Sequence, residues 1–126
     1  MTAQQWVAAH FGRCRPWIDA ALAAYPLRTH TIEHVREALE SGNCMLWPTA
    51  NSAAVVEIVE HPTGLRTLHH WLAGGDLDEL RETAGRVEAF AREHGFAAVT
   101  ISGRPGWARA LPGYRRVAAL TMKDLR

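Results

Sequence analysis

Residues 68–80, LHHWLAGGDLDEL, constrain the fold of this chain more than any other segment. They predict an apolar strand that ends at Gly74-Gly75 and passes directly into a long helix over 77–94. Leu77, Leu80, Ala84 and later apolar residues recur there at helical spacing. The first amides of a helix are free and the positive end of its dipole lies there. The junction therefore has the form of an anion site.

The same junction carries negative charge in the first helical turn, at Asp76, Asp78 and Glu79. Two interpretations follow. In the first, the glycines expose backbone amides to a pyrophosphate or another anion. In the second, they form a tight turn at positive φ, Asp76 caps the helix, and the other two carboxylates complement the dipole without a ligand.

Length and charge narrow the class of protein. A chain of 126 residues predicts a single domain over 1–126, large enough for a core without disulfides. The net charge of +1 gives no basic field, so nucleic acid is not expected as a direct ligand. Cys14 and Cys44 lack CxxC spacing, and no metal site is expected. Without an apolar run of about 20 residues or a signal peptide, we expect a cytoplasmic protein or one packaged from the cytoplasm, with no membrane association.

Helical and strand periodicity alternate along the chain. Residues 2–11 are ambiguous between a short strand and a first helical turn, and 97–102 are apolar enough to predict a strand buried on both faces. The fold class is α/β, an α+β mixed sheet in the order ααβββαβαβ. The expected helices are 13–24, 32–41, 77–94 and 106–111, and the expected strands are Cys44–Pro48, Ser52–Glu60, 66–73, 97–102 and 115–122.

This order resembles the GNAT superfamily of acyl-CoA N-acyltransferases. The landmarks are the strand, glycine pair and helix of 66–94, the strand 97–102, and the step Gly113-Tyr114. The resemblance implies a single GNAT-like domain and acetyl-CoA as a cofactor. It also implies cofactor binding by a set of residues from the glycine loop and the following short helix: Leu72, Ala73, Gly74, Gly75, Asp76, Arg104 and Arg109.

A narrower resemblance is to small GNAT-like proteins of tailed bacteriophages and prophages. It is carried by the words AGGDLDEL and SGRPGWARAL and by the pair Lys123 and Leu125. This resemblance implies a component or accessory of a phage particle, located in the cytoplasm of a bacterial host or in the virion. It also implies other phage or host proteins as partners, and an oligomer is compatible with it. The five tryptophans, if some are exposed, suit such protein contacts.

The chain departs from the GNAT pattern at two places. The cofactor loop lacks its leading Arg or Gln, and its second glycine comes one position early, at Gly75. No tyrosine lies a few residues before Gly113, where many members place the acid for the departing thiolate. These departures leave two functions open, a protein with a degenerate acyl-CoA site that acts through protein contacts, or an active acetyl-CoA-dependent N-acyltransferase. A toxin- or antitoxin-like partner protein is a third class.

Glu57 and His70 are the catalytic candidates. Glu57 lies among apolar strand residues, where a raised pKa would suit proton relay from an amine, and a histidine titrates near neutral pH. His69 and His70 point to opposite faces of their strand, so one of them can face a cleft. The alternative for each residue is an ordinary strand side chain. Arg104 and Arg109 either bind an anion or pair with the acidic turn at 76–79.

Overall fold

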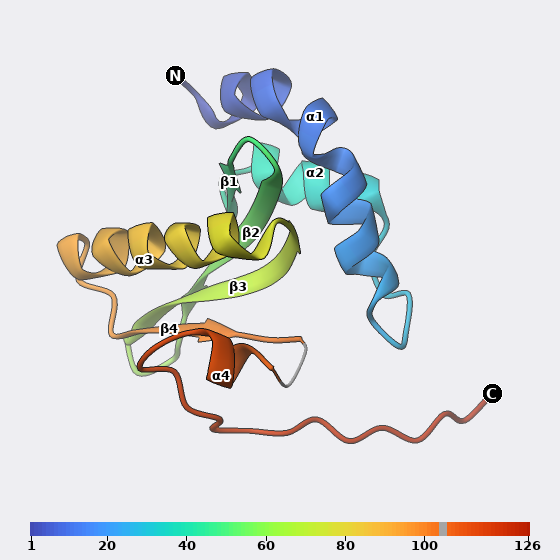
Figure 1. Ribbon diagram of the computed structural model, residues 1–126, viewed down its shortest axis with the longest axis vertical. Helices are drawn as coiled ribbons and strands as arrows, with labels where there is room; N and C mark the ends of the chain where they lie inside the picture. The colour runs from blue at the N-terminus through green and yellow to red at the C-terminus, as the bar shows by residue number, and fades with distance from the viewer. Residues whose placement is uncertain (104–105) are drawn as a thin grey trace.

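The computed structural model describes residues 1–103 and 106–126, which form one mixed α+β domain (Figure 1). Four helices and four strands follow one another in the order ααβββαβα within these residues. The elements are α1 (Ala3–Ala23), α2 (Ile32–Glu40), β1 (Cys44–Pro48), β2 (Ser52–Glu60), β3 (Arg66–Gly75), α3 (Leu77–Glu93), β4 (Ala98–Ile101) and α4 (Trp107–Ala110).

Helix α1 begins ten residues earlier than the sequence pattern predicted. The hydroxyl of Thr2 accepts a hydrogen bond from the Gln5 amide at 3.1 Å, and the Gln5 side chain accepts one from the Thr2 amide at 2.8 Å. This capping box starts the helix and decides the ambiguous residues 2–11 in favour of helix. Val7 and Phe11 then lie on the buried face of α1.

The sheet has the strand order β1-β2-β3-β4. The first three strands form an antiparallel meander, and β4 pairs with β3 in parallel. Helix α3 connects these two parallel strands, because parallel neighbours need a crossover connection. Pairing of β3 with β4 covers four residues on each strand, from Thr67↔Ala98 to His70↔Ile101.

Two hydrophobic clusters pack on opposite faces of the sheet, with α1 and α2 on one side and α3 on the other (Figure 1). Val55 and Leu72 belong to the cluster with α1 and α2, whereas Val56 and Leu68 belong to the cluster with α3. The register shifts between Val55 and Val56, so that Trp71 is an extra residue in β3. This β-bulge moves the side chains after Trp71 to the opposite faces.

Two strand predictions were wrong. Residues 115–122 form no strand, so the last element of the predicted order is absent. The predicted burial of 97–102 on both faces fails as well, since Ala98 is exposed and the rest of β4 is half-buried. Both errors have one cause, because no strand covers the outer edge of β4 among the described residues. No helix in the described ranges is long and apolar enough to cross a membrane.

Candidate functional site

The glycine pair at the end of β3 is required by close backbone packing. A Cβ atom on Gly74 would lie 2.5 Å from the carbonyl oxygen of Trp17 in α1. Gly75 has a φ of 108°, and a Cβ atom there would collide with the backbone of Asn51 and Ser52. The tight turn at positive φ is thus present, and both glycines have a structural role that needs no ligand.

The N-terminus of α3 is capped from within the chain. The carboxylate of Asp76 accepts a hydrogen bond from the Glu79 amide at 3.0 Å, and the Asp76 amide donates to the Asn51 carbonyl at 2.9 Å. The Glu79 carboxylate accepts from the Asn51 amide at 2.8 Å. That bond, followed by one from the Thr49 hydroxyl, lowers the pKa of Glu79 below its ordinary value. The self-capping interpretation therefore accounts for the acidic turn.

The remaining cofactor candidates do not converge on this turn. Leu72 is 2% exposed in the core, and Ala73 lines a small cavity on the α3 face. Arg109 is exposed on α4, and the structure gives it no ion pair with the acidic turn within the described part of the chain. Arg81 pairs with Asp78 instead, at 3.2 Å. Arg104 lies outside the described residues.

The two catalytic candidates lie on opposite faces of the sheet. Glu57 is paired with His69, so these two side chains share the α1 and α2 face. His70 is paired with Val56 and points toward α3. Glu57 and His70 therefore cannot act on one substrate from the same side. The sequence indicated that the two histidines diverge, but only the strand register decides which of them accompanies Glu57.

A row of polar side chains crosses all four strands on the α1 and α2 face. The register aligns Cys44 with Glu57, Glu57 with His69, and His69 with Thr100. His69 bonds through Nδ1 to the Thr100 hydroxyl at 2.7 Å and through Nε2 to the Ser102 hydroxyl at 3.0 Å. We call these five residues the polar row. Sequence reasoning missed most of it, because its members are scattered from 44 to 102 and share no local motif.

Burial shifts the pKa values of two members of the polar row, His69 and Cys44. It lowers the pKa of His69, although the charge of Glu57 acts in the opposite direction. Burial and then the charge of Glu57 raise the pKa of Cys44 to about 11. At neutral pH, His69 is therefore a neutral imidazole that can accept a proton, and Cys44 is a protonated thiol of low nucleophilicity.

The pairing of β3 with β4 ends at His70 and Ile101, and β3 continues alone to Gly75. On the α1 side, the Tyr25 hydroxyl donates to the Trp71 carbonyl at 2.7 Å and lies 3.2 Å from the Ser102 hydroxyl. On the α3 side, Trp107 and Leu111 leave a cavity of about 10 Å³. That volume is about enough for one water molecule.

His70 lines this small cavity and is 5% exposed. Its Nε2 atom has no hydrogen-bond partner among the described residues. Burial, and then the neighbouring His69, lower the pKa of His70 to about 4, so its imidazole is neutral at physiological pH. His70 thus serves as a core residue here, with no access for a substrate larger than water.

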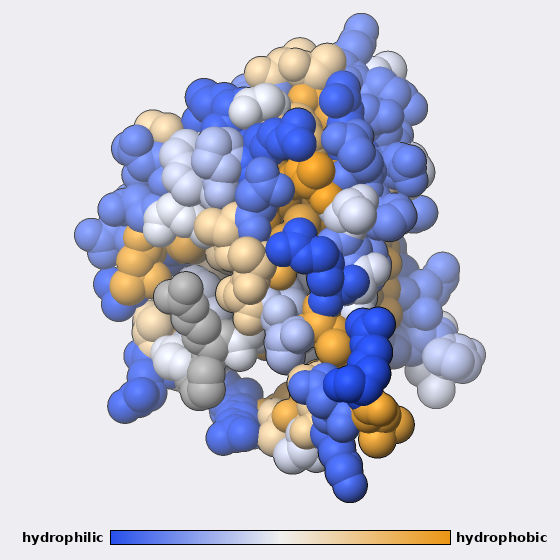
Figure 2. Space-filling view, turned by 90° about the vertical axis from the view of Figure 1, so that its right-hand side faces the viewer, coloured by the Kyte–Doolittle hydropathy of each residue, from blue (hydrophilic) through white to orange (hydrophobic). Residues whose placement is uncertain are grey.

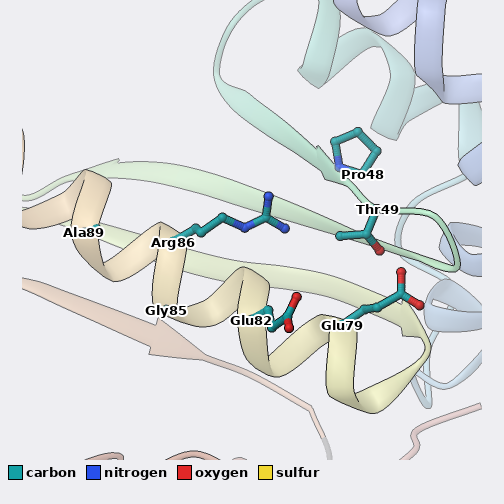
Figure 3. A pocket seen from close by; sticks show the side chains of 7 residues that line it. All are labelled: Pro48, Thr49, Glu79, Glu82, Gly85, Arg86 and Ala89. Atoms are coloured by element: carbon teal, nitrogen blue, oxygen red, sulfur yellow. The ribbon is translucent and has the colours of Figure 1, made fainter.

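A larger groove of about 630 Å³ lies between α3 and the end of β1 (Figure 3). Glu79, Glu82 and Arg86 reach into it from α3, and the Arg86 side chain extends toward Thr49. Two carboxylates and one guanidinium share this open space, and no histidine, cysteine or serine of the described ranges lines it. The Thr49 hydroxyl is hydrogen-bonded to Ser52 and has no histidine of the described residues beside it in the groove, so we assign the groove no chemistry.

Comparisons with known proteins support the fold of the chain but identify no function. No protein-family model matches the chain, and no curated protein matches it by sequence. Among solved structures, the wild-type protein TTHA1254 from Thermus thermophilus is similar with a TM-score of 0.57 and 16% identity over 86% of this chain and 92% of that one. A single-substitution mutant of the same Thermus protein gives a TM-score of 0.55 at the same identity and coverage. The mixed α+β architecture is therefore shared with a known structure.

Proposed function

We propose that this chain is a GNAT-like protein that does not bind acyl-CoA and acts through protein contacts, as a component or accessory of a bacteriophage particle. The phage assignment rests on the resemblance of the words at 73–80 and 102–111 to small phage proteins. The loss of acyl-CoA binding rests on the geometry at the start of α3.

The observation that carries the proposal is the internally capped N-terminus of α3. A GNAT-like site needs those amides for the cofactor pyrophosphate, but Asp76 and Glu79 already place carboxylates there. A carboxylate about 4 Å from a phosphate charge costs on the order of 1–4 kcal/mol between the dielectric of water and that of a protein surface. The residues present therefore do not fit acyl-CoA.

The place where the pairing of β3 with β4 ends supports the same conclusion, because the arm of a GNAT-like cofactor would lie there. On one face of the sheet, the Tyr25 hydroxyl is hydrogen-bonded to the Trp71 carbonyl. On the other face, Trp107 and Leu111 leave only a small cavity. A cofactor arm that lies between the strands would have to displace these side chains. The cavity of about 10 Å³ gives it no room without such a rearrangement.

Isothermal titration of the purified protein with acetyl-CoA tests the first half of the proposal. We expect no heat of binding at millimolar ligand, whereas a micromolar Kd would overturn it. A matched variant, Asp76→Asn with Glu79→Gln, keeps side-chain acceptors at the cap but removes both charges. Binding gained only by this variant would identify charge, rather than the closed gap, as the main barrier.

Mass spectrometry of purified particles tests the second half. Particles from the phage or prophage that encodes this chain should contain it in a fixed ratio to the major structural proteins. Its absence from particles of a host that expresses it would contradict the particle assignment and leave the acyl-CoA result unaffected.

The polar row favours a second candidate, an N-acyltransferase that acts on an amine. His69 is neutral at physiological pH and lies beside Glu57, so it can accept the amine proton. Release of free thiol from acetyl-CoA, assayed over a panel of amines, tests this candidate. Activity lost in His69→Gln but kept in His70→Gln would support it.

A further inference from the structure

The outer edge of β4 is an open strand edge. Within the described residues β4 pairs with β3 alone, and Ala98 at its start is exposed. The opposite edge of the sheet is better protected, since the Trp6 indole donates to the Leu46 carbonyl of β1 at 2.9 Å and that strand ends at Pro48. An unprotected edge presents backbone donors and acceptors that can pair with another strand.

Residues 115–126, which we call the tail, carry the apolar side chains that such an edge needs. Val117 is 71% exposed, Leu120 is 95% exposed and Leu125 is 90% exposed, so the tail does not pack on its own domain. The lower end of Figure 2, where Figure 1 places the tail, shows apolar side chains among hydrophilic ones. A solvated chain of this kind gains stability when its apolar side chains are buried.

The sequence of the tail suits a strand. Its apolar and small residues at 117–122 form the run VAALTM, with arginines before it and Lys123 and Asp124 after it. The sequence pattern alone predicted a strand over 115–122, but this segment is unpaired and forms no strand in a single copy. The chain therefore contains both an open edge and an unpaired strand sequence.

The path of the chain disfavours pairing of the tail with its own β4. Tyr114, just before the tail, is half-buried beside Glu88 and Arg92 of α3, near the end of the helix that leads into β4. From there the tail runs in the same direction as β4 (Figure 1). Pairing within one copy would thus be parallel, at an edge that no helix of the described ranges covers on its outer side. Parallel pairs are less stable per residue and occur mainly where both faces are buried.

We infer that residues 115–122 pair as an exchanged strand with the outer edge of β4 in a second copy of this chain. A two-fold axis perpendicular to β4 turns the partner's tail antiparallel to the strand. Each copy then gives one strand and receives one, as a closed two-fold interface requires. Ala118, Leu120 and Met122 lie on one face of the exchanged strand and become buried against Val99 and Ile101, which are half-buried in one copy. This interface does not depend on whether acyl-CoA binds.

Light scattering after size exclusion tests the oligomeric state of the full chain. We expect a dimer, and Leu120→Asp should convert it to a monomer, since a charge would be buried at the interface. Leu120 is 95% exposed in one copy, so the domain should keep its circular dichroism spectrum. The matched control is Leu65→Asp at a 50% exposed turn position, which should remain dimeric. A wild-type monomer, or a dimer unaffected by Leu120→Asp, overturns the inference.

Cross-linking identifies the strand that fills the edge. One differently tagged copy carries Ala98→Cys and the other Ala119→Cys, which lie on the same face of the paired strands, and a short bis-maleimide reagent is added to the mixed sample. Cys14 and Cys44 are buried and give low background. We expect a cross-link between the two tags. A cross-link within one chain of the double variant, with none between copies, would show that the tail pairs with its own β4 and would overturn the exchange.

Discussion

Glu57 and His69 lie opposite each other on β2 and β3, on the face of the sheet that packs against α1 and α2. The carboxylate raises the proton affinity of the imidazole while burial lowers it, with burial the larger effect. His70, one residue further along, faces α3 and a cavity of about 10 Å³. Adjacent histidines thus have different surroundings, and only His69 belongs to the polar row.

Gly74→Ala should destabilise the protein by about 1–3 kcal/mol, because the new methyl group would meet the Trp17 carbonyl of α1. The control is Gly85→Ala on the exposed side of α3, where a Cβ atom meets nothing within 4 Å. That change should stabilise the protein by about 0.5–1 kcal/mol through helix propensity. Urea denaturation measures both. Equal effects of the two substitutions would contradict the close packing of Gly74.

Tyr25→Phe should cost about 1 kcal/mol, because the Trp71 carbonyl loses its donor and the Ser102 hydroxyl loses a neighbour. Tyr114→Phe is the matched control. The buried Tyr114 hydroxyl makes no hydrogen bond of ordinary geometry among the described residues, although it lies close to Glu88. Burial, followed by the charge of Glu88 and a weak contact with its carboxylate, raises the pKa of Tyr114. Its removal should be neutral or stabilising. Thermal denaturation should therefore give a lower Tm for Tyr25→Phe than for Tyr114→Phe. The reverse order would contradict a stabilising role for the Tyr25 hydrogen bond.

Asp76→Ala should destabilise the protein by about 1 kcal/mol, as expected for loss of an N-cap. Asp78→Ala tests charge alone, since the Asp78 side chain is 89% exposed and its ion pair in the described part of the chain is with Arg81. That variant should lose only about 0.3–0.5 kcal/mol. The free energies of unfolding in urea give both values. If Asp76→Ala cost no more than Asp78→Ala, the cap would contribute nothing beyond its charge.

The free energy of unfolding should fall with pH below about 6.5 because of His70. Its pKa is about 4 in the folded protein, against about 6.5 in an unfolded chain. Between these values the unfolded chain binds more protons, so acidification favours unfolding; above about 6.5 neither state is protonated and the effect vanishes. The loss approaches roughly 3 kcal/mol at pH 4.

His70→Leu removes the titrating group while keeping a side chain of similar volume. Its unfolding free energy should decline less steeply than that of the wild type between pH 6.5 and 4. Urea denaturation across this range measures the difference. Parallel pH profiles for the two proteins would show that His70 is not the group responsible.

Much of the fold could be predicted because its signals are local. The capped helix after Thr31, the meander of β1 to β3 and the junction at Gly74 and Gly75 each depend on residues that are neighbours in sequence. The candidate site could not be predicted in this way. Its pairing of Glu57 with His69, and of His69 with Thr100 and Ser102, depends on strand register and on the bulge at Trp71.

The sequence by itself determined where the chain turns from strand to helix, since the glycine pair and Asp76 encode the turn and its cap. Tertiary structure decided what that turn is for. Only contact with Trp17 and Asn51, which lie far from the turn in sequence, shows that both glycines pack against backbone and that the Asp76 amide is already hydrogen-bonded. The fate of residues 115–122 is also a tertiary matter, because a strand forms only where a partner edge satisfies its backbone.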